Sequence, residues 1–118
     1  MYARMPGDPT CDHGSTAPPA ICSDGVLERA AAILRAAGDP GRLRLLELLR
    51  SGERCVTELA EFTGDSLSAV SARLRVLRTE RLLTRRREGK HQYYSLADQH
   101  VVEVLQGVFD HAAEEESK

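Results

Sequence analysis

Leucine, valine and alanine recur at helical spacing along most of the chain, and residues that cap or break helices bound each run. The apolar positions lie three and four residues apart, which is the period of a helix that buries one face. Capping residues precede the runs, and glycine follows several of them. The pattern predicts five helices: about Val26 to Ala37, Pro40 to the Ser51-Gly52 pair, Val56 to Thr63, about Leu67 to Glu80, and Asp98 to Glu114.

The residues before these runs predict how the helices begin. We expect Asp24 to cap the first helix and Asp39 the second, with Pro40 at the first helical position. We expect Ser66 and Asp98 to cap the fourth and fifth helices, because their side-chain oxygens can accept the free N–H groups of a first turn.

A short turn and a predicted hairpin define the fold class. The third and fourth helices are joined by Gly64-Asp65-Ser66, which is typical of a helix-turn-helix. Two stretches, Leu82 to Arg86 and His91 to Leu96, read as strands, with Gly89 in the turn between them. The order of elements predicts a mainly α (α+β) fold: a winged helix-turn-helix with an added C-terminal dimerisation helix.

The ends of the chain differ from its centre. Four of the five prolines lie within residues 1–20, so we expect residues 1–22 to form a flexible arm. Residues 23–114 are predicted to form one domain for DNA binding and dimerisation, and residues 115–118 an acidic tail. There is no signal-peptide pattern and no apolar run near the length of a membrane span. Together with an odd count of three cysteines, this indicates a cytoplasmic protein.

The net charge of −2 conceals a basic segment. Between Arg73 and Lys90 there are eight cations and two anions, whereas acidic residues gather from Asp98 onwards. The second helix of a helix-turn-helix enters the major groove of double-stranded DNA, and basic wing residues meet phosphate. A solvated basic face is the alternative interpretation. The residues predicted to contact DNA are Ser66, Ser68, Ser71, Arg73, Arg75, Arg78, Arg87 and Lys90.

The last predicted helix carries metal-ligand residue types along one stripe. His100, Val104, Gly107, His111 and Glu114 follow at steps of four, three, four and three, which places them on one face. His100 and His111 lie about three turns, roughly 16 Å, apart along the axis, so one chain cannot bring both to one ion. His111 can converge with Glu114, and His100 with the capping aspartate. The stripe therefore holds two half-sites, one at each end.

A second copy of this helix, running antiparallel, would complete both half-sites. A two-fold axis near Gly107, where glycine lets backbones approach closely, would bring the first half-site of one chain to the second half-site of the other. Two imidazoles and two carboxylates suit tetrahedral Zn(II), and Co(II) or Ni(II) less well. Alternatively, the aspartate is only a cap, the histidines are ordinary interface residues, and the glutamate belongs to the acidic tail. The predicted ligands of two zinc sites per homodimer are Asp98, His100, His111 and Glu114.

Four motifs follow one another along the chain: Asp39-Pro-Gly-Arg-Leu-Arg-Leu-Leu-Glu-Leu-Leu, Cys55-Val-Thr-Glu-Leu-Ala, Ser66-Leu-Ser-Ala-Val-Ser and Gly89-Lys-His-Gln-Tyr-Tyr-Ser-Leu. Together they resemble the ArsR/SmtB family of metal-sensing repressors, over about Leu27 to Glu114. The resemblance implies a bacterial, cytoplasmic homodimer that binds an inverted-repeat operator without metal and is released when metal binds. The zinc-sensing branch carries Asp-x-His and His-x-x-Glu on its last helix, and the segment from Asp98 to Glu114 matches this pattern.

The resemblance also implies a second metal site in some members. Cys55 matches the first cysteine of that site, and Glu58 falls where an acidic ligand can occur. Cys11 and His13 would reach over from the partner's arm. Thr57 stands where thiolate-rich sites carry another cysteine, which argues against a strong cadmium or lead site.

The same resemblance suggests how metal and DNA sites communicate. In relatives, the ligand that corresponds to His111 reaches the end of the recognition helix. Leu77 and Arg81 stand there in this chain, so they are the expected allosteric link.

Three other functions remain as alternatives. A thiol or redox-responsive repressor on the same fold would use Cys55 with Cys11 or Cys22. A winged helix can also bind protein instead of DNA. An enzyme is disfavoured, because the chain has no His-Glu-x-x-His motif, no phosphate loop and no nucleophile with a visible base. Four protein ligands would also close a metal to any small-molecule substrate.

Overall fold

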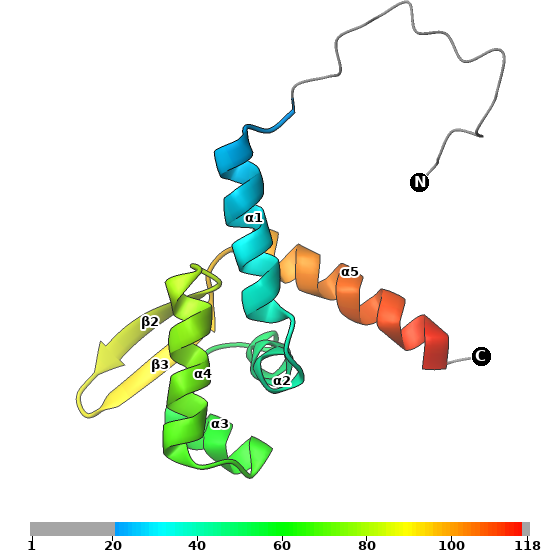
Figure 1. Cartoon of the computed structure of the whole chain (residues 1–118). Coiled ribbons are helices and arrows are strands. Elements are labelled where there is room, and N and C mark those ends of the chain that lie inside the picture. Colours follow the sequence, from blue (N-terminus) through cyan, green and yellow to red (C-terminus); the bar gives the residue numbers. More distant parts are fainter. Residues whose placement is uncertain (1–20, 117–118) are drawn as a thin grey trace, which may run out of the picture.

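The computed structural model describes residues 21–116, which form five helices and a small three-stranded sheet (Figure 1). This confirms the predicted mainly α winged helix-turn-helix with an added C-terminal helix. The elements are α1 (Asp24–Ala37), α2 (Pro40–Leu49), β1 (Arg54–Cys55), α3 (Val56–Thr63), α4 (Leu67–Thr79), β2 (Leu83–Glu88), β3 (His91–Leu96) and α5 (Gln99–Glu116).

The helix starts agree with the predicted caps except at α1. Asp39, Ser66 and Asp98 each accept a backbone N–H group of the following first turn, as predicted. At α1 the prediction of Asp24 was wrong by one residue. Ser23 is the extended N-cap, and its hydroxyl accepts the N–H of Val26 at 3.2 Å. Asp24 lies inside the first turn, where its negative charge still favours the helix dipole.

The bounds of α5 and β2 differ slightly from the predicted ones. The last helix continues to Glu116, two residues beyond the predicted end at Glu114. The division of the chain into arm, domain and tail stays a prediction. β2 begins at Leu83 and continues to Glu88, so it lies slightly further along the chain than predicted.

The two-residue strand β1 was not predicted. It pairs antiparallel with β3, placing Arg54 opposite Tyr94 and Cys55 opposite Tyr93, and β3 lies between β1 and β2. Two residues are too few to show the alternation that identifies a strand. The pairing ties the segment before α3 to the root of the wing formed by β2 and β3.

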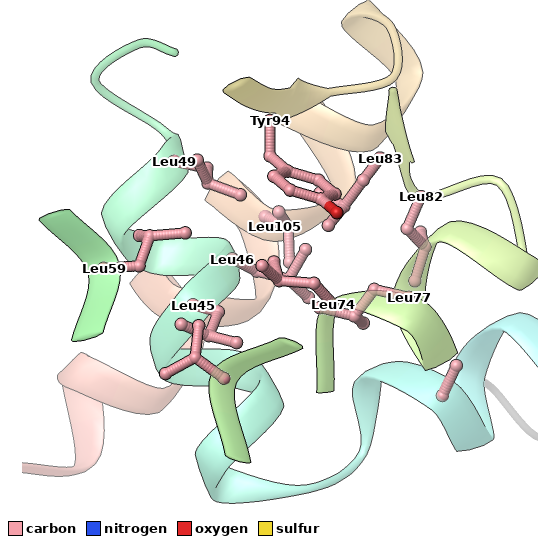
Figure 2. Packing of buried hydrophobic residues seen from close by; sticks show 12 residues of the cluster. Leu45, Leu46, Leu49, Leu59, Leu74, Leu77, Leu82, Leu83, Tyr94 and Leu105 are labelled. Atoms are coloured by element: carbon pink, nitrogen blue, oxygen red, sulfur yellow. The ribbon is translucent and has the colours of Figure 1, made fainter. Parts of the chain in front are cut away.

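Leucines from α2, α3 and α4 build the core on which the wing and α5 are mounted. Figure 2 shows Leu46 and Leu74 facing one another, with Tyr94 of β3 and Leu105 of α5 closing one side. Beyond Leu105, α5 extends away from the core on the side opposite the wing (Figure 1). The fully buried side chains are Leu45, Leu46, Leu49, Leu59, Val70, Leu74 and Leu77.

The chain leaves α4 through a residue in the left-handed region. Arg81 has φ of 61°, and it is the one described non-glycine residue with a positive φ. The N–H of Leu82 donates to the carbonyl of Leu77 at 3.0 Å, and the N–H of Arg81 donates to Arg78 at 2.9 Å. These bonds form a Schellman-type end, which usually carries glycine at the left-handed position.

Candidate metal centre and nucleic-acid interface

The start of α5 brings together the first predicted pair of metal ligands. Nδ1 of His100 lies 3.7 Å from Oδ1 of Asp98, and both side chains are largely exposed. Oδ1 also accepts the N–H of Val101 at 3.1 Å, which fixes the carboxylate at the helix start. The capping role and the ligand role are therefore compatible, since a carboxylate can accept a cap bond and still offer a free oxygen.

The far end of α5 brings together the second predicted pair. Nδ1 of His111 lies 3.9 Å from Oε1 of Glu114, one helical turn away, and both side chains are exposed. Within residues 21–116, no group of three or more histidine, cysteine, aspartate or glutamate side chains could hold an ion. Each end of α5 thus provides two potential ligands, as the helical spacing predicts.

The donor set fits a divalent transition metal only if two half-sites combine. One half-site offers one imidazole nitrogen and one carboxylate, which is half of a tetrahedral zinc shell. These side chains are exposed and, within residues 21–116, form no ion pair with an arginine or lysine, so they can converge on an ion.

The stripe between the half-sites is apolar and uncovered. Val104 is 56% exposed and Val108 47% exposed, although both are aliphatic. A Cβ built on Gly107, which lies between them, would meet no atom within 4 Å. On α1, Leu27 and Leu34 are also more than half exposed. Apolar surface of this kind indicates a protein contact.

The predicted allosteric link lies next to the first half-site. Arg81 lines the same groove as Asp98 and His100, between α1, the end of α4 and the start of α5. Leu77 is fully buried, and only its carbonyl takes part in the end of α4. The structure thus brings Arg81 to the Asp98–His100 end of α5, whereas His111 lies at the other end.

A groove between α4 and the wing carries half of the predicted DNA contacts. Ser71, Arg75 and Arg78 line it from α4, and Lys90 lines it from the wing. Ser68 lies on the adjacent surface near the start of α4. Ser66 uses its hydroxyl to cap the helix by accepting the N–H of Ala69. Because basic side chains lie on both walls, this groove is suited to binding an anionic polymer.

Arg73, also predicted to contact DNA, has a partner within the protein. Its Nη1 donates to Oδ2 of Asp65 in the helix-turn-helix loop at 2.9 Å. A Cβ built on Gly41 would lie 2.8 Å from Nε of Arg73, so glycine at the start of α2 makes room for this side chain. The ion pair therefore joins α4 to the turn, and the same side chain lies close to the start of α2. DNA contact by Arg73 stays a prediction.

The three wing arginines have different surroundings. Arg86 forms a two-pronged ion pair with Glu53, over distances of 3.1 and 2.8 Å, and stacks over Tyr93. These hydrogen bonds, together with the arginine charge, hold the pKa of Glu53 below its ordinary value. The side chain of Arg87 bonds weakly to the Gly89 carbonyl in the wing turn.

Arg85 is a groove residue that the sequence interpretation missed. It lines the groove beside α4, and its Nη1 donates to Oε1 of Gln92 at 3.3 Å. The period of two along a strand places Arg85 and Arg87 on one face and Arg86 on the other. That alternation was a signal from which Arg85 could have been found.

The second predicted metal site is described only in part. Glu58 accepts the backbone N–H of Cys55 at 3.0 Å, as in a capping box at the start of α3. The half-buried Cys55 and the exposed Cys22 are free thiols. Cys11 and His13 lie outside the described residues, so this site stays a prediction.

Comparison with known proteins gives the family. Residues 39–85 match the model described as "Bacterial regulatory protein, arsR family". The "Transcriptional repressor SmtB homolog" of Synechocystis is 44% identical over 81% of this chain and 73% of its own length. The "HTH-type transcriptional regulator NmtR" of Mycobacterium tuberculosis is 39% identical over 84% of this chain and 82% of its own length.

Solved structures share the fold. The homodimeric winged helix-turn-helix DNA-binding domain Mb0332 of Mycobacterium bovis superposes with a TM-score of 0.75 at 35% identity, covering 83% of this chain and 91% of that one. NolR of Sinorhizobium fredii superposes with a TM-score of 0.67 at 33% identity, covering 80% of this chain and 95% of that one. Among the described helices, none is long and apolar enough to cross a membrane. With a repressor 44% identical over most of both chains, this chain belongs to the arsR family of bacterial regulatory proteins.

Proposed function

We propose that this protein is a homodimeric transcriptional repressor of the bacterial cytoplasm that binds operator DNA without metal and is released when it binds Zn(II). The observation that carries the proposal is the pair of half-sites on α5. Asp98 and His100 approach one another at one end, and His111 and Glu114 at the other. Co(II), Ni(II) or Cd(II) are weaker candidates for the effector.

Two observations support a dimer formed through α5. A structural relative is a homodimeric winged helix-turn-helix domain. The exposed Val104 and Val108 on α5, with the open Gly107 between them, give a face that a second copy can cover. An antiparallel pairing of the two α5 helices would place opposite half-sites together, whereas a parallel pairing would join each half-site to its own copy.

In the proposed dimer, each metal shell comes from two chains. Asp98 and His100 of one protomer would combine with the partner's His111 and the partner's Glu114. An ion bound there supplies bonds between the protomers that are absent without it. Asp98 remains anchored by its cap bond to Val101, so the carboxylate position is set by the helix start.

The basic groove between α4 and the wing is the proposed DNA surface. The start of α4, with small Ser68 and Ser71, can approach base edges, whereas Arg75 and Arg78 lie further along the helix, where they would meet phosphate. Two such surfaces in a dimer would meet the halves of an inverted repeat. Metal then opposes DNA if the two ligands favour different dimer geometries, through a coupling free energy of typically about 1–3 kcal/mol.

The test is a zinc titration of the complex between the full-length protein and a duplex that the protein has selected from a random pool. The proposal expects operator affinity to fall on zinc binding, with two ions bound per dimer. Tight DNA binding that zinc leaves unchanged would overturn the proposed switch.

A thiol switch is a second candidate because Cys55 lines the groove between α4 and the wing as a free thiol. Replacing Cys11, Cys22 and Cys55 by serine separates the two functions. A zinc switch on α5 survives this change, whereas a thiol switch is lost.

A further inference from the structure

The wing and the free end of α5 project from opposite sides of the core (Figure 1). Within one protomer, any influence of one on the other must therefore pass through the body of the domain. The turn between α2 and β1, taken together with Arg54 at the start of β1, spans residues 50–54. It touches both, and neither of the functional surfaces described above makes use of it.

At one end this turn holds α5. The Arg50 guanidinium lies 5.1 Å from the centre of the Phe109 ring, and its Nη2 donates to Oε1 of Gln106. Gln106 in turn donates to Asp110 at 2.8 Å. Both contact residues of Arg50 lie between the two half-sites, next to Gly107. Rotation or translation of α5 would therefore displace Arg50 directly.

At the other end the same turn holds the wing. Oε1 and Oε2 of Glu53 accept two hydrogen bonds from Arg86 of β2, at 2.8 and 3.1 Å. Arg86 lies over the ring of Tyr93 at 4.8 Å, which links it to β3 as well. Because two hydrogen bonds join Glu53 and Arg86, the relative orientation of the two side chains is fixed as well as their distance.

Between its ends the turn is internally bonded. The guanidinium of Arg54 donates to the carbonyl of Leu48 at 3.2 Å and to the hydroxyl of Ser51 at 3.0 Å. The N–H of Gly52 donates to the carbonyl of Leu49 at 3.2 Å. These bonds make the turn a stiff connection, and not a slack loop, between its two ends.

We propose that the turn from Arg50 to Arg54 is the mechanical link between α5 and the wing, with Arg50 and Glu53 as its positioning residues. Through this link, DNA bound at the wing restrains α5, and a change at α5 moves the wing. The part of this inference that concerns DNA is independent of any metal. The part that concerns zinc rests on the proposed function.

The chain offers matched controls. Arg44 and Glu47 form an exposed ion pair with one another within α2, close in sequence to the link, so this ion pair joins α2 to neither α5 nor the wing. Glu47→Gln removes the same charge as Glu53→Gln, and Arg44→Met the same charge as Arg50→Met. General effects of charge or of α2 stability should appear equally in both pairs.

The first experiment uses metal-free protein and the selected duplex. Hydrogen exchange of the α5 amides from Glu103 to Asp110 is measured with and without DNA. We expect DNA to slow this exchange in the wild type and in both control variants, and the slowing to be at least halved in Arg50→Met and in Glu53→Gln. Slowing that persists in both link variants, or that is absent from the wild type, overturns the link.

The second experiment adds zinc. Variants along a coupling path change coupling by a factor of roughly 2 to 30, so we expect the zinc-induced loss of DNA affinity to shrink by that factor in Arg50→Met and Glu53→Gln. Zinc affinity without DNA should stay within about twofold of the wild type, because neither residue is a ligand. An undiminished zinc effect in both variants contradicts the link. Zinc without effect on wild-type DNA binding overturns the proposed function, while the metal-free experiment still decides the link.

Discussion

Two arginines of α4 have different surroundings, and this difference leads to a quantitative prediction about DNA binding. Arg75 lines the groove, whereas Arg73 is ion-paired with Asp65 and is 32% exposed. Replacing each by glutamine removes the same charge from the same helix. Arg75→Gln should weaken binding and lower its salt dependence, while Arg73→Gln should change the salt dependence much less.

The magnitude follows from the cations that line the groove. There are four per protomer, and therefore twice that number in a dimer: Arg75, Arg78, Arg85 and Lys90. If each neutralises one phosphate, log affinity falls with log salt at a slope of about −7. Arg75→Gln removes two of these cations per dimer, so the slope should become shallower by about 1.8.

The assay is fluorescence anisotropy with a labelled duplex across a salt series. From about 50 to about 200 mM salt, the wild type should lose affinity by about 20,000-fold and Arg75→Gln by about 2,000-fold. An unchanged slope for Arg75→Gln would refute the assignment of this groove to phosphate contact. An equal change of slope for Arg73→Gln would show that Arg73 leaves Asp65 to contact DNA, in accordance with the sequence-based prediction.

Substitutions at three further positions test the site and the fold. His111→Ala should keep operator affinity within about twofold in gel shifts and lose the zinc effect, and normal release by zinc would contradict the site. Leu74→Ala, at a fully buried position, should cost about 2–5 kcal/mol in urea denaturation, and a loss below about 1 kcal/mol would contradict the described packing. Arg81→Gly should stabilise the protein by about 0.5–1 kcal/mol, because relief of the left-handed conformation outweighs the added freedom of the unfolded chain, whereas Arg81→Ala should give no such gain.

The helices were predictable because their signals are local. Periodicity and caps such as Asp39 and Ser66 act within one or two turns, and the structure confirms them. Asp24 was misplaced by one residue because Ser23 and Asp24 are both good caps, and the backbone conformation decides between them. β1 escaped notice because its pairing with Tyr93 and Tyr94 is a long-range contact.

The identity and spacing of the functional residues were easier to predict from the sequence than the partners that surround each of them. Sequence spacing placed His111 and Glu114 one turn apart, and the structure brings them together. The partners of Arg73 and Arg86 could not be read from the sequence, because Asp65 and Glu53 meet them only in the folded domain. Charge clustering therefore located a basic surface without showing which cations already have a protein partner.

A mixed dimer tests the central claim that each metal site is shared between two chains. One protomer carries His100→Ala and the other His111→Ala, and the mixed species is purified with two different affinity tags. Shared sites leave one intact set of four ligands, so the account predicts one zinc ion per mixed dimer at wild-type affinity and none in either homodimer of the variants. A mixed dimer without any such ion would contradict the shared site.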